Sequence, residues 1–170
     1  MQIIAVAGKM RAGKDTFGEV FLEHNPSFIR VAFADPLKEE YAEANNITVE
    51  EVNINKDFHR QGLIDYGQFR RDQEALYWVH KAINIPGDKI ITDVRFLNEF
   101  EVLKDLGAVM VRIESELEQR AKRGMIISDS ISETALDNRD DWDFVLYNNS
   151  DLESFKWQSL RIVETLSLPL

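Results

Sequence analysis

A glycine-flanked basic loop near the start of the chain is the clearest candidate for chemistry. The stretch GKMRAGK, residues 8–14, matches the pattern G-x-x-x-x-G-K. Glycines let the backbone curl so that successive N–H groups point at one phosphate, and the lysine adds a positive charge. We therefore expect Lys14 to reach the β- and γ-phosphates of a nucleotide. The other loop residues expected to line the phosphates are Gly8, Arg11, Ala12 and Gly13.

The residues after the lysine indicate how a cation would be held. In the usual motif a hydroxyl residue directly follows the lysine and contacts magnesium. Here Asp15 takes that place and Thr16 comes one residue later. Adenylate-kinase-like loops read G-x-x-x-x-G-K-G-T, so Thr16 matches the hydroxyl on the magnesium side. Asp15 belongs to the same nucleotide-binding turn, although the helix dipole alone would also favour a carboxylate there.

The elements that must position this loop are a strand before it and a helix after it. Apolar runs without alternation are typical of strands covered on both faces, and they recur along the chain with helical patterns between them. This alternation predicts an α/β fold with three α/β/α layers, a five-stranded parallel sheet, and ligands beyond the carboxyl ends of the strands. The expected strands span residues 3–7, 28–33, 89–92, 108–113 and 143–147.

Two helices outside the loop have specific expected bounds. The segment ADPLKEEYAEANN predicts a helix with Asp35 as N-cap and Pro36 at the first helical position. The apolar spacing from Phe69 to Ile83 predicts one continuous helix that stops at Pro86-Gly87. Aromatic residues in this second helix are expected to be core rather than stacked on a base.

Composition narrows the class of protein. A chain of 170 residues that is 44% hydrophobic can bury one substantial core, so we expect a single domain. The net charge of −10 disfavours a broad contact with nucleic acid, so a bound anion must meet local positive charge. The absence of cysteine fits a reducing cytoplasm. The first apolar run breaks at Gly8, too early for a signal peptide or a membrane span, so no membrane partner is expected.

Further segments, in order along nearly the whole chain, resemble one known family. The loop reads GKDT, and it is followed by FADPLK (33–38), TDVRFLNE (92–99), the pair Ser132-Glu133, and DFVLYNNSDLESF (143–155). In these segments the chain resembles the deoxynucleoside monophosphate kinases of bacteriophages, within the P-loop nucleotide kinases. Family members often carry a histidine shortly before the Ser-Glu pair, where this chain reads Asp-Ser-Ile at residues 129–131.

The resemblance implies a reaction and a division of the chain. The implied reaction moves the γ-phosphoryl group of ATP, with Mg²⁺, onto a small-molecule deoxynucleoside monophosphate in the cytoplasm of an infected host. The implied parts of the domain are a core (about 1–35, 86–114 and 140–170), acceptor-binding helices (about 35–85) and a lid (about 115–134). The sequence does not decide between a monomer and a homodimer, or which base is accepted.

Residues after the other strands are assigned roles by the same resemblance. Asp93 would hold the metal through water, or else cap a helix, and Arg95 would bind the acceptor phosphate. Asn149 would lie near the donor adenine, although Asn148 and Asn149 also suit a simple turn. The remaining residues implied at the acceptor are Asp35, Lys38, Arg70 and Glu133. Arg70 is preferred to Arg71 because adjacent helical residues point about 100° apart.

The cationic segment after the fourth strand is the expected lid. Arg120 and Arg123 resemble the arginines that stabilise charge as the site of a nucleotide kinase closes. A Glu116–Arg120 pair on a solvated helix is the alternative. Gly124 is the expected hinge.

Two other functions remain open at this point. Dephospho-coenzyme A kinase has similar second-strand and carboxy-terminal motifs. A nucleotide-binding switch that hydrolyses ATP slowly would also carry the loop. The basic lid and the acidic helix after the second strand favour a small acceptor.

Overall fold

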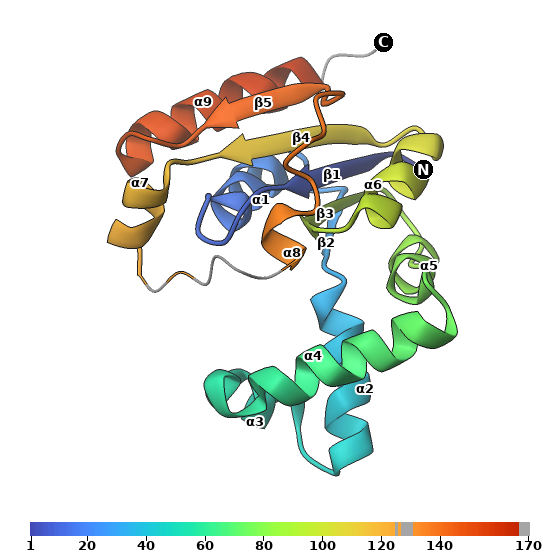
Figure 1. The fold of residues 1–170 in the computed structure, drawn as a ribbon. Helices are drawn as coiled ribbons and strands as arrows, with labels where there is room; N and C mark the ends of the chain where they lie inside the picture. The colour runs from blue at the N-terminus through green and yellow to red at the C-terminus, as the bar shows by residue number, and fades with distance from the viewer. Residues whose placement is uncertain (125, 127–130, 167–170) are drawn as a thin grey trace. The chain divides into compact units, whose positions relative to one another are not determined.

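The computed structural model describes residues 1–124, 126 and 131–166, and the chain forms two compact units (Figure 1). Unit 1 comprises Met1–Arg30 and Gly87–Leu170, and unit 2 is Val31–Pro86. Unit 2 nearly coincides with the interval expected to hold the acceptor-binding helices, and that role stays a prediction. Of the three residues at which the chain departs from the family pattern, 129 and 130 lie outside the described part of the chain, and Ile131 is described.

Unit 1 is built on a five-stranded sheet in the order β2-β3-β1-β4-β5. Strand β1 pairs in parallel with β3 and β4, and β4 pairs in parallel with β5. The α/β fold with a parallel sheet is therefore confirmed, and each expected strand is present within a few residues of its expected bounds. The strands are β1 (Ile3–Ala7), β2 (Ile29–Val31), β3 (Lys89–Val94), β4 (Val109–Glu114) and β5 (Phe144–Tyr147).

The order of the strands places the loop after β1 at a point of the sheet that favours ligand binding. All five residues of β1 are buried, as the run of apolar residues predicts for a central strand. The chain leaves β1 toward β2 and β3 on one side, and β4 and β5 lie on the other side. Ligands of open α/β sheets bind where the strand order reverses in this way, beyond the carboxyl ends of the strands.

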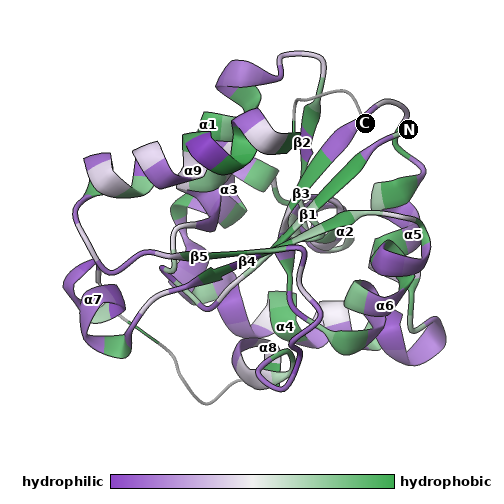
Figure 2. Cartoon of the chain, turned by 90° about the horizontal axis from the view of Figure 1, so that it is seen from above, coloured by the Kyte–Doolittle hydropathy of each residue, from purple (hydrophilic) through white to green (hydrophobic). Residues whose placement is uncertain are grey.

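Helices cover both faces of the sheet (Figures 1 and 2). Helices α1 (Lys14–His24) and α9 (Leu152–Leu166) pack on one face, where Phe17 and Phe155 are fully buried. On the other face, α6 (Leu97–Asp105) brings Phe100 edge-on to Trp142, with ring centroids 4.7 Å apart. Helix α8 (Ile131–Thr134) lies on this second face, and α7 (Leu117–Lys122) follows β4.

Unit 2 is helical. Its elements are α2 (Ala34–Asn45), α3 (Val49–Ile54), α4 (Lys56–Gln73) and α5 (Tyr77–Ile83). Trp78 is buried and donates its indole N–H to the carbonyl oxygen of Gly67 at 3.2 Å, which ties α5 to α4. The expectation that Trp78 is core is confirmed, whereas the same expectation is wrong for Phe69, which is 53% exposed.

Two helix boundaries differ from the sequence expectation. Helix α2 begins at Ala34, so Asp35 lies inside the first turn and is not the N-cap. The N-cap is Phe33, whose buried ring and helical φ of −61° start the turn earlier. The expectation of one continuous helix from Phe69 to Ile83 is wrong. The backbone is extended at Glu74, and this break divides the segment between α4 and α5.

Within the part of the chain that the structure describes, no helix is both long enough and apolar enough to cross a membrane.

Candidate active site

The loop between β1 and α1 has a backbone that requires its two glycines. A Cβ on Gly8 would lie 2.5 Å from the main-chain oxygen of Ile113. Gly13 has a φ of 115°, and a Cβ there would lie 2.5 Å from Nδ2 of Asn148. Side chains at either position would therefore force the loop away from strand β4 or from the turn after β5. Arg11 also has a left-handed φ of 62°, which sharpens the curve of the loop.

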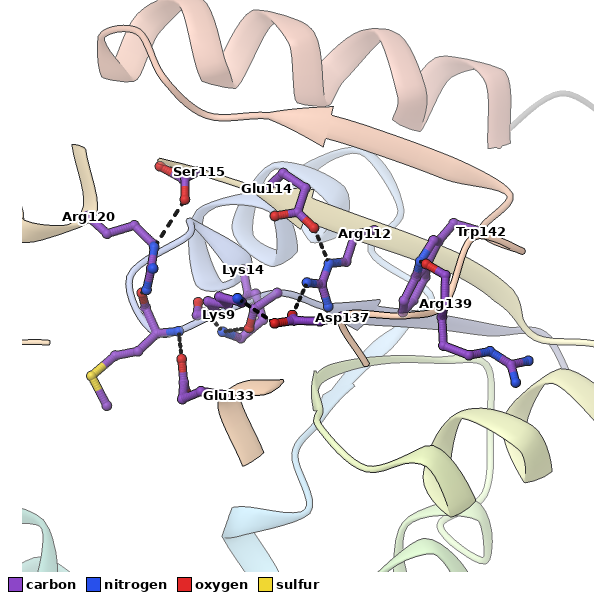
Figure 3. A network of polar contacts seen from close by, with 12 residues as sticks. Lys9, Lys14, Arg112, Glu114, Ser115, Arg120, Glu133, Asp137, Arg139 and Trp142 are labelled. Atoms are coloured by element: carbon purple, nitrogen blue, oxygen red, sulfur yellow. Dashed lines mark hydrogen bonds and ion pairs between the residues drawn. The ribbon is translucent and has the colours of Figure 1, made fainter. Parts of the chain in front are cut away.

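Lys14 points back into the curve of this loop. Its Nζ donates to the carbonyl oxygens of Gly8 at 2.6 Å and Lys9 at 3.0 Å (Figure 3). Burial, and secondly the positive charge of Arg95, lowers the pKa of Lys14 to about 8, against a partial opposing effect of nearby carboxylates. The loop thus holds a costly positive charge that an incoming anion would stabilise.

The two arginines expected in the lid lie against the loop. Arg120 is buried and donates from Nε to the Ser115 carbonyl at 3.1 Å and from Nη1 to the Met10 carbonyl at 3.2 Å. Arg123 donates to the Arg11 carbonyl at 3.0 Å, and burial lowers its pKa. The structure therefore brings both predicted arginines to the phosphate-binding loop, although their action as a mobile lid stays a prediction.

The alternative pairing of Glu116 with Arg120 is not what orders this segment. The Glu116 N–H donates to Oδ1 of Asn149 at 2.8 Å, and the Asn149 amide donates to the Glu116 carboxylate at 3.2 Å. Asn149 thus fixes the start of α7, and Arg120 is engaged by main-chain carbonyls instead. Part of the expected lid, residues 125 and 127–130, lies outside the described residues.

Asn148 has a more direct contact with the loop than its neighbour. It is buried, and its Nδ2 donates to the Ala12 carbonyl at 2.7 Å. Its own carbonyl accepts from Arg123 at 2.8 Å and from the hydroxyl of Ser115 at 2.7 Å. The turn after β5 is therefore joined to the loop and to the start of the lid segment. Sequence reasoning placed the pair of asparagines here but did not identify Ser115.

Two acidic residues face the loop from α8 and the turn after it. Oε2 of Glu133 accepts the N–H of Met10 at 2.6 Å, and its Oε1 lies 3.4 Å from Nη1 of Arg95. One turn later, Asp137 forms an ion pair with Lys9 at 2.7 Å (Figure 3). Sequence reasoning did not find Asp137, because nothing in the local pattern relates it to a loop more than one hundred residues away.

The residues at the end of β3 contribute charge to the same place. Asp93 lies inside β3, one residue before its end, and its carboxylate is close enough to Lys14 to raise the pKa of that lysine. Arg95 acts on Lys14 in the opposite direction. The main-chain N–H of Arg95 donates to Oε2 of Glu99 at 2.8 Å, which fixes the backbone from which the arginine side chain extends.

The candidate metal ligands are oxygen donors of the kind that magnesium prefers. Thr16 is partly buried in the first turn of α1, and Asp93 faces the same lysine. Among residues 1–124, 126 and 131–166, no three His, Asp or Glu side chains are grouped so that they could hold a metal. The two oxygen donors of Thr16 and Asp93 fit Mg²⁺, which is commonly held by one or two protein oxygens together with water and phosphates. Asp15 is exposed and lies 3.8 Å from Arg30.

The residues expected to bind the acceptor from unit 2 lie on α2 and α4. Asp35 and Lys38 are partly buried in the first turns of α2. Arg70 donates to the Glu40 carboxylate at 2.9 Å, and its guanidinium lies 5.5 Å from the ring centroid of Tyr66. Arg70 is thus part of an ion pair inside unit 2, which the sequence did not predict.

Glu40 is the centre of this second cluster. Besides Arg70, it accepts from the hydroxyl of Tyr77 at 2.7 Å and from Lys81 at 2.8 Å. Burial would raise the pKa of Glu40, but hydrogen bonds from Lys81 and Tyr77 lower it overall. The cluster joins α2, α4 and α5 through one carboxylate.

Comparison with known proteins supports a kinase. Residues 6–109 match the family model of phosphomevalonate kinase. A protein of Acanthamoeba polyphaga mimivirus, provisionally named a deoxynucleotide monophosphate kinase, is 26% identical and covers 98% of both chains. Among solved structures, shikimate kinase from Bacteroides thetaiotaomicron has a TM-score of 0.59 at 19% identity, covering 98% of this chain and 99% of its own. A gluconokinase from Sinorhizobium meliloti 1021 has a TM-score of 0.55 at 15% identity, covering 98% and 93%.

The structural neighbours establish the three-layer fold of P-loop kinases, and the matched family model spans the loop, strands β2 and β3, and the whole of unit 2. The chain is therefore a kinase that belongs to the phosphomevalonate kinase family.

Proposed function

We propose that this kinase transfers the γ-phosphoryl group of ATP to the phosphate of a deoxynucleoside 5′-monophosphate, giving the diphosphate. The observation that carries the proposal is the gathering of Lys14 and Arg95 beside one phosphate-binding loop. Transfer between two phosphates brings several negative charges together, so the protein must mainly position the two molecules and neutralise their oxygens. Lys14 is the donor-side cation of this pair and Arg95 the acceptor-side cation.

A phosphate is the acceptor that these charges favour. The positive charge of Arg95 contributes to the lowered pKa of Lys14, so the two cations repel each other, and Glu133 offsets only part of this repulsion. A neutral hydroxyl acceptor would not relieve that repulsion, whereas an acceptor phosphate would. The name of the matched family and the name of the mimivirus relative both denote acceptors that already carry a phosphate.

Phosphomevalonate is the second candidate acceptor, because the family model that matches residues 6–109 is named for it. The mimivirus relative favours a deoxynucleotide, and the resemblance of FADPLK and TDVRFLNE favours it too. In this proposal Asp35, Lys38 and Arg70 of unit 2 contact the nucleotide acceptor.

Mg²⁺ would be held by Thr16 and, through water, by Asp93, and it would neutralise charge on the phosphate oxygens of ATP. Arg120 and Arg123 act in this proposal on the transferring group. They already contact the loop through the carbonyls of Met10 and Arg11, which supports their action on a triphosphate bound there. Asn149 is the residue that this proposal places at the adenine side.

The test is an acceptor panel with purified protein, ATP and Mg²⁺, read as ADP formation and as phosphorylated product. The panel contains the deoxynucleoside and ribonucleoside monophosphates, phosphomevalonate, dephospho-coenzyme A, shikimate and gluconate. We expect product from at least one deoxynucleoside monophosphate, and none when Lys14 is changed to alanine. Lys156→Ala is the matched control, since it removes an exposed lysine of α9.

Each outcome of the panel decides between the candidates. Product only from phosphomevalonate replaces the deoxynucleotide with the second candidate, and product only from dephospho-coenzyme A overturns both. ATP consumption that no acceptor changes would favour a nucleotide-binding switch. Unaltered turnover in Lys14→Ala would overturn the assignment of the donor site.

A further inference from the structure

The carboxylate of Glu133 lies where the loop would be expected to meet an anion. Its Oε2 accepts the main-chain N–H of Met10, inside the loop, at 2.6 Å. Its side chain is only 5% exposed, so water contributes little to its solvation. A carboxylate and a phosphate present similar negatively charged oxygens to an amide donor, so one can occupy the place of the other.

The surroundings of Glu133 are cationic. Nη1 of Arg95 lies 3.4 Å from Oε1 of Glu133, and the negative charge of Glu133 raises the pKa of Lys14. Arg95 and Lys14 are the groups to which the proposed function assigns phosphate oxygens, and the Met10 amide belongs to the same loop as Lys14. Glu133 therefore interacts with both the donor-side and the acceptor-side cations at once.

We propose that Glu133 is an autoinhibitory anion, which holds the phosphate-binding groups in the ligand-free protein and must withdraw when the triphosphate binds. The proposal rests on the proposed function only in taking the loop to bind a triphosphate. As long as α8 does not move, Glu133 therefore weakens the binding of nucleotide. The contact also offsets part of the positive charge of Arg95 and Lys14 while no substrate is present.

The contacts of Asp137 allow an autoinhibitory role of Glu133 to be distinguished from a purely structural role. Asp137 follows α8 by one turn and is tied to Lys9 at 2.7 Å and to Nη2 of Arg112 at 3.4 Å. The segment would therefore stay attached to the loop after the charge of Glu133 is removed. Glu133→Gln keeps the shape of the side chain and removes only the charge, which makes it the informative variant.

The experiment measures binding of inorganic tripolyphosphate, and of a nonhydrolysable ATP analogue with Mg²⁺, by calorimetry. Tripolyphosphate tests the loop without any contribution from the base. We expect Glu133→Gln to bind tripolyphosphate about tenfold more tightly than the wild type, since the anion no longer displaces a charged hydrogen-bond partner. Glu101→Gln is the matched control, because it removes an equal charge from an exposed position of α6. It should change the affinity less than about twofold.

A second readout follows the Met10 amide by NMR. Its proton signal should shift between the wild type and Glu133→Gln when no ligand is present. With saturating tripolyphosphate the two proteins should give the same signal, because the amide then donates to phosphate in both. Thermal unfolding without ligand verifies that both variants are folded.

The outcomes separate this inference from the proposed function. Equal or weaker tripolyphosphate binding by Glu133→Gln overturns the autoinhibition and leaves the kinase assignment intact. Met10 signals that remain different at saturation overturn it as well. If neither protein binds tripolyphosphate or the ATP analogue, the donor site of the proposed function falls together with the inference.

Discussion

The lowered pKa of Lys14 makes the stability of the protein depend on pH in a way that can be calculated. In the folded protein this pKa is about 8, whereas the ordinary value is 10.5. The folded state therefore binds fewer protons than the unfolded state between these two values. Stability must rise with pH across that window, because the penalty for holding a charged lysine disappears as the lysine loses its proton.

The size of the effect follows from the two pKa values. At pH 7 the charged lysine costs about 3 kcal/mol of folding free energy relative to an uncharged one, and at pH 9.5 about 1 kcal/mol. The wild type should therefore gain about 2 kcal/mol between these pH values compared with Lys14→Met, which has no charge to lose at this position.

Urea denaturation of both proteins at pH 7.0, 8.5 and 9.5 measures this gain. Other groups titrate equally in the two proteins, so they cancel when the free energies of unfolding are subtracted. Lys81→Met is the control, since Glu40 raises the pKa of Lys81 and the difference from wild type should stay flat over the same range. Parallel pH curves for the wild type and Lys14→Met would refute the reasoning, because Lys14 would then titrate as an ordinary lysine.

Four other substitutions test the site and the fold. Arg95→Ala should raise KM for the acceptor about tenfold to a hundredfold and leave KM for ATP nearly unchanged, measured in steady-state assays. Gly13→Ala should lower the free energy of unfolding by at least about 2 kcal/mol in urea, because its Cβ would lie 2.5 Å from the Asn148 amide. Arg123→Ala should lower kcat at least about tenfold while Tm falls by only a few degrees in calorimetry. Glu40→Ala should destabilise the protein by about 2 kcal/mol, followed by circular dichroism, since it leaves paired cations without their carboxylate.

Local sequence features were enough to predict the loop and the sheet. The loop pattern depends on glycines and a lysine within seven residues, and the strands appear as short apolar runs. Both signals arise from neighbouring residues, which is why they could be recognised without any tertiary contact. The alternation of strands and helices then determined the order of layers.

The boundaries that failed depend on tertiary contacts. Burial of Phe33 starts α2 two residues earlier than the capping preference of Asp35 indicated. The break at Glu74 lets Tyr77 and Lys81 reach Glu40 from a separate helix, and apolar spacing cannot reveal such a break. In each case packing or pairing outweighed the local propensity.

The contacts made by acidic residues with the loop were beyond sequence reasoning for the same reason. Glu133 meets Met10 across 123 positions of the chain, and Asp137 meets Lys9 across 128. The resemblance pointed to Glu133 as an acceptor ligand, a role that stays a prediction. It gave no indication that the carboxylate would accept a loop amide.

The close packing around Gly13 has a practical consequence for work with this enzyme. A Cβ at Gly13 would lie 2.9 Å from the ring of Phe155, so the curve of the loop is shaped by the carboxy-terminal helix α9. Truncating that helix, or fusing a bulky partner that pulls on it, would change the shape of the nucleotide-binding turn at the opposite end of the sequence. Affinity tags are better attached through a long spacer, and deletion mapping from the carboxyl end will register as lost ATP binding.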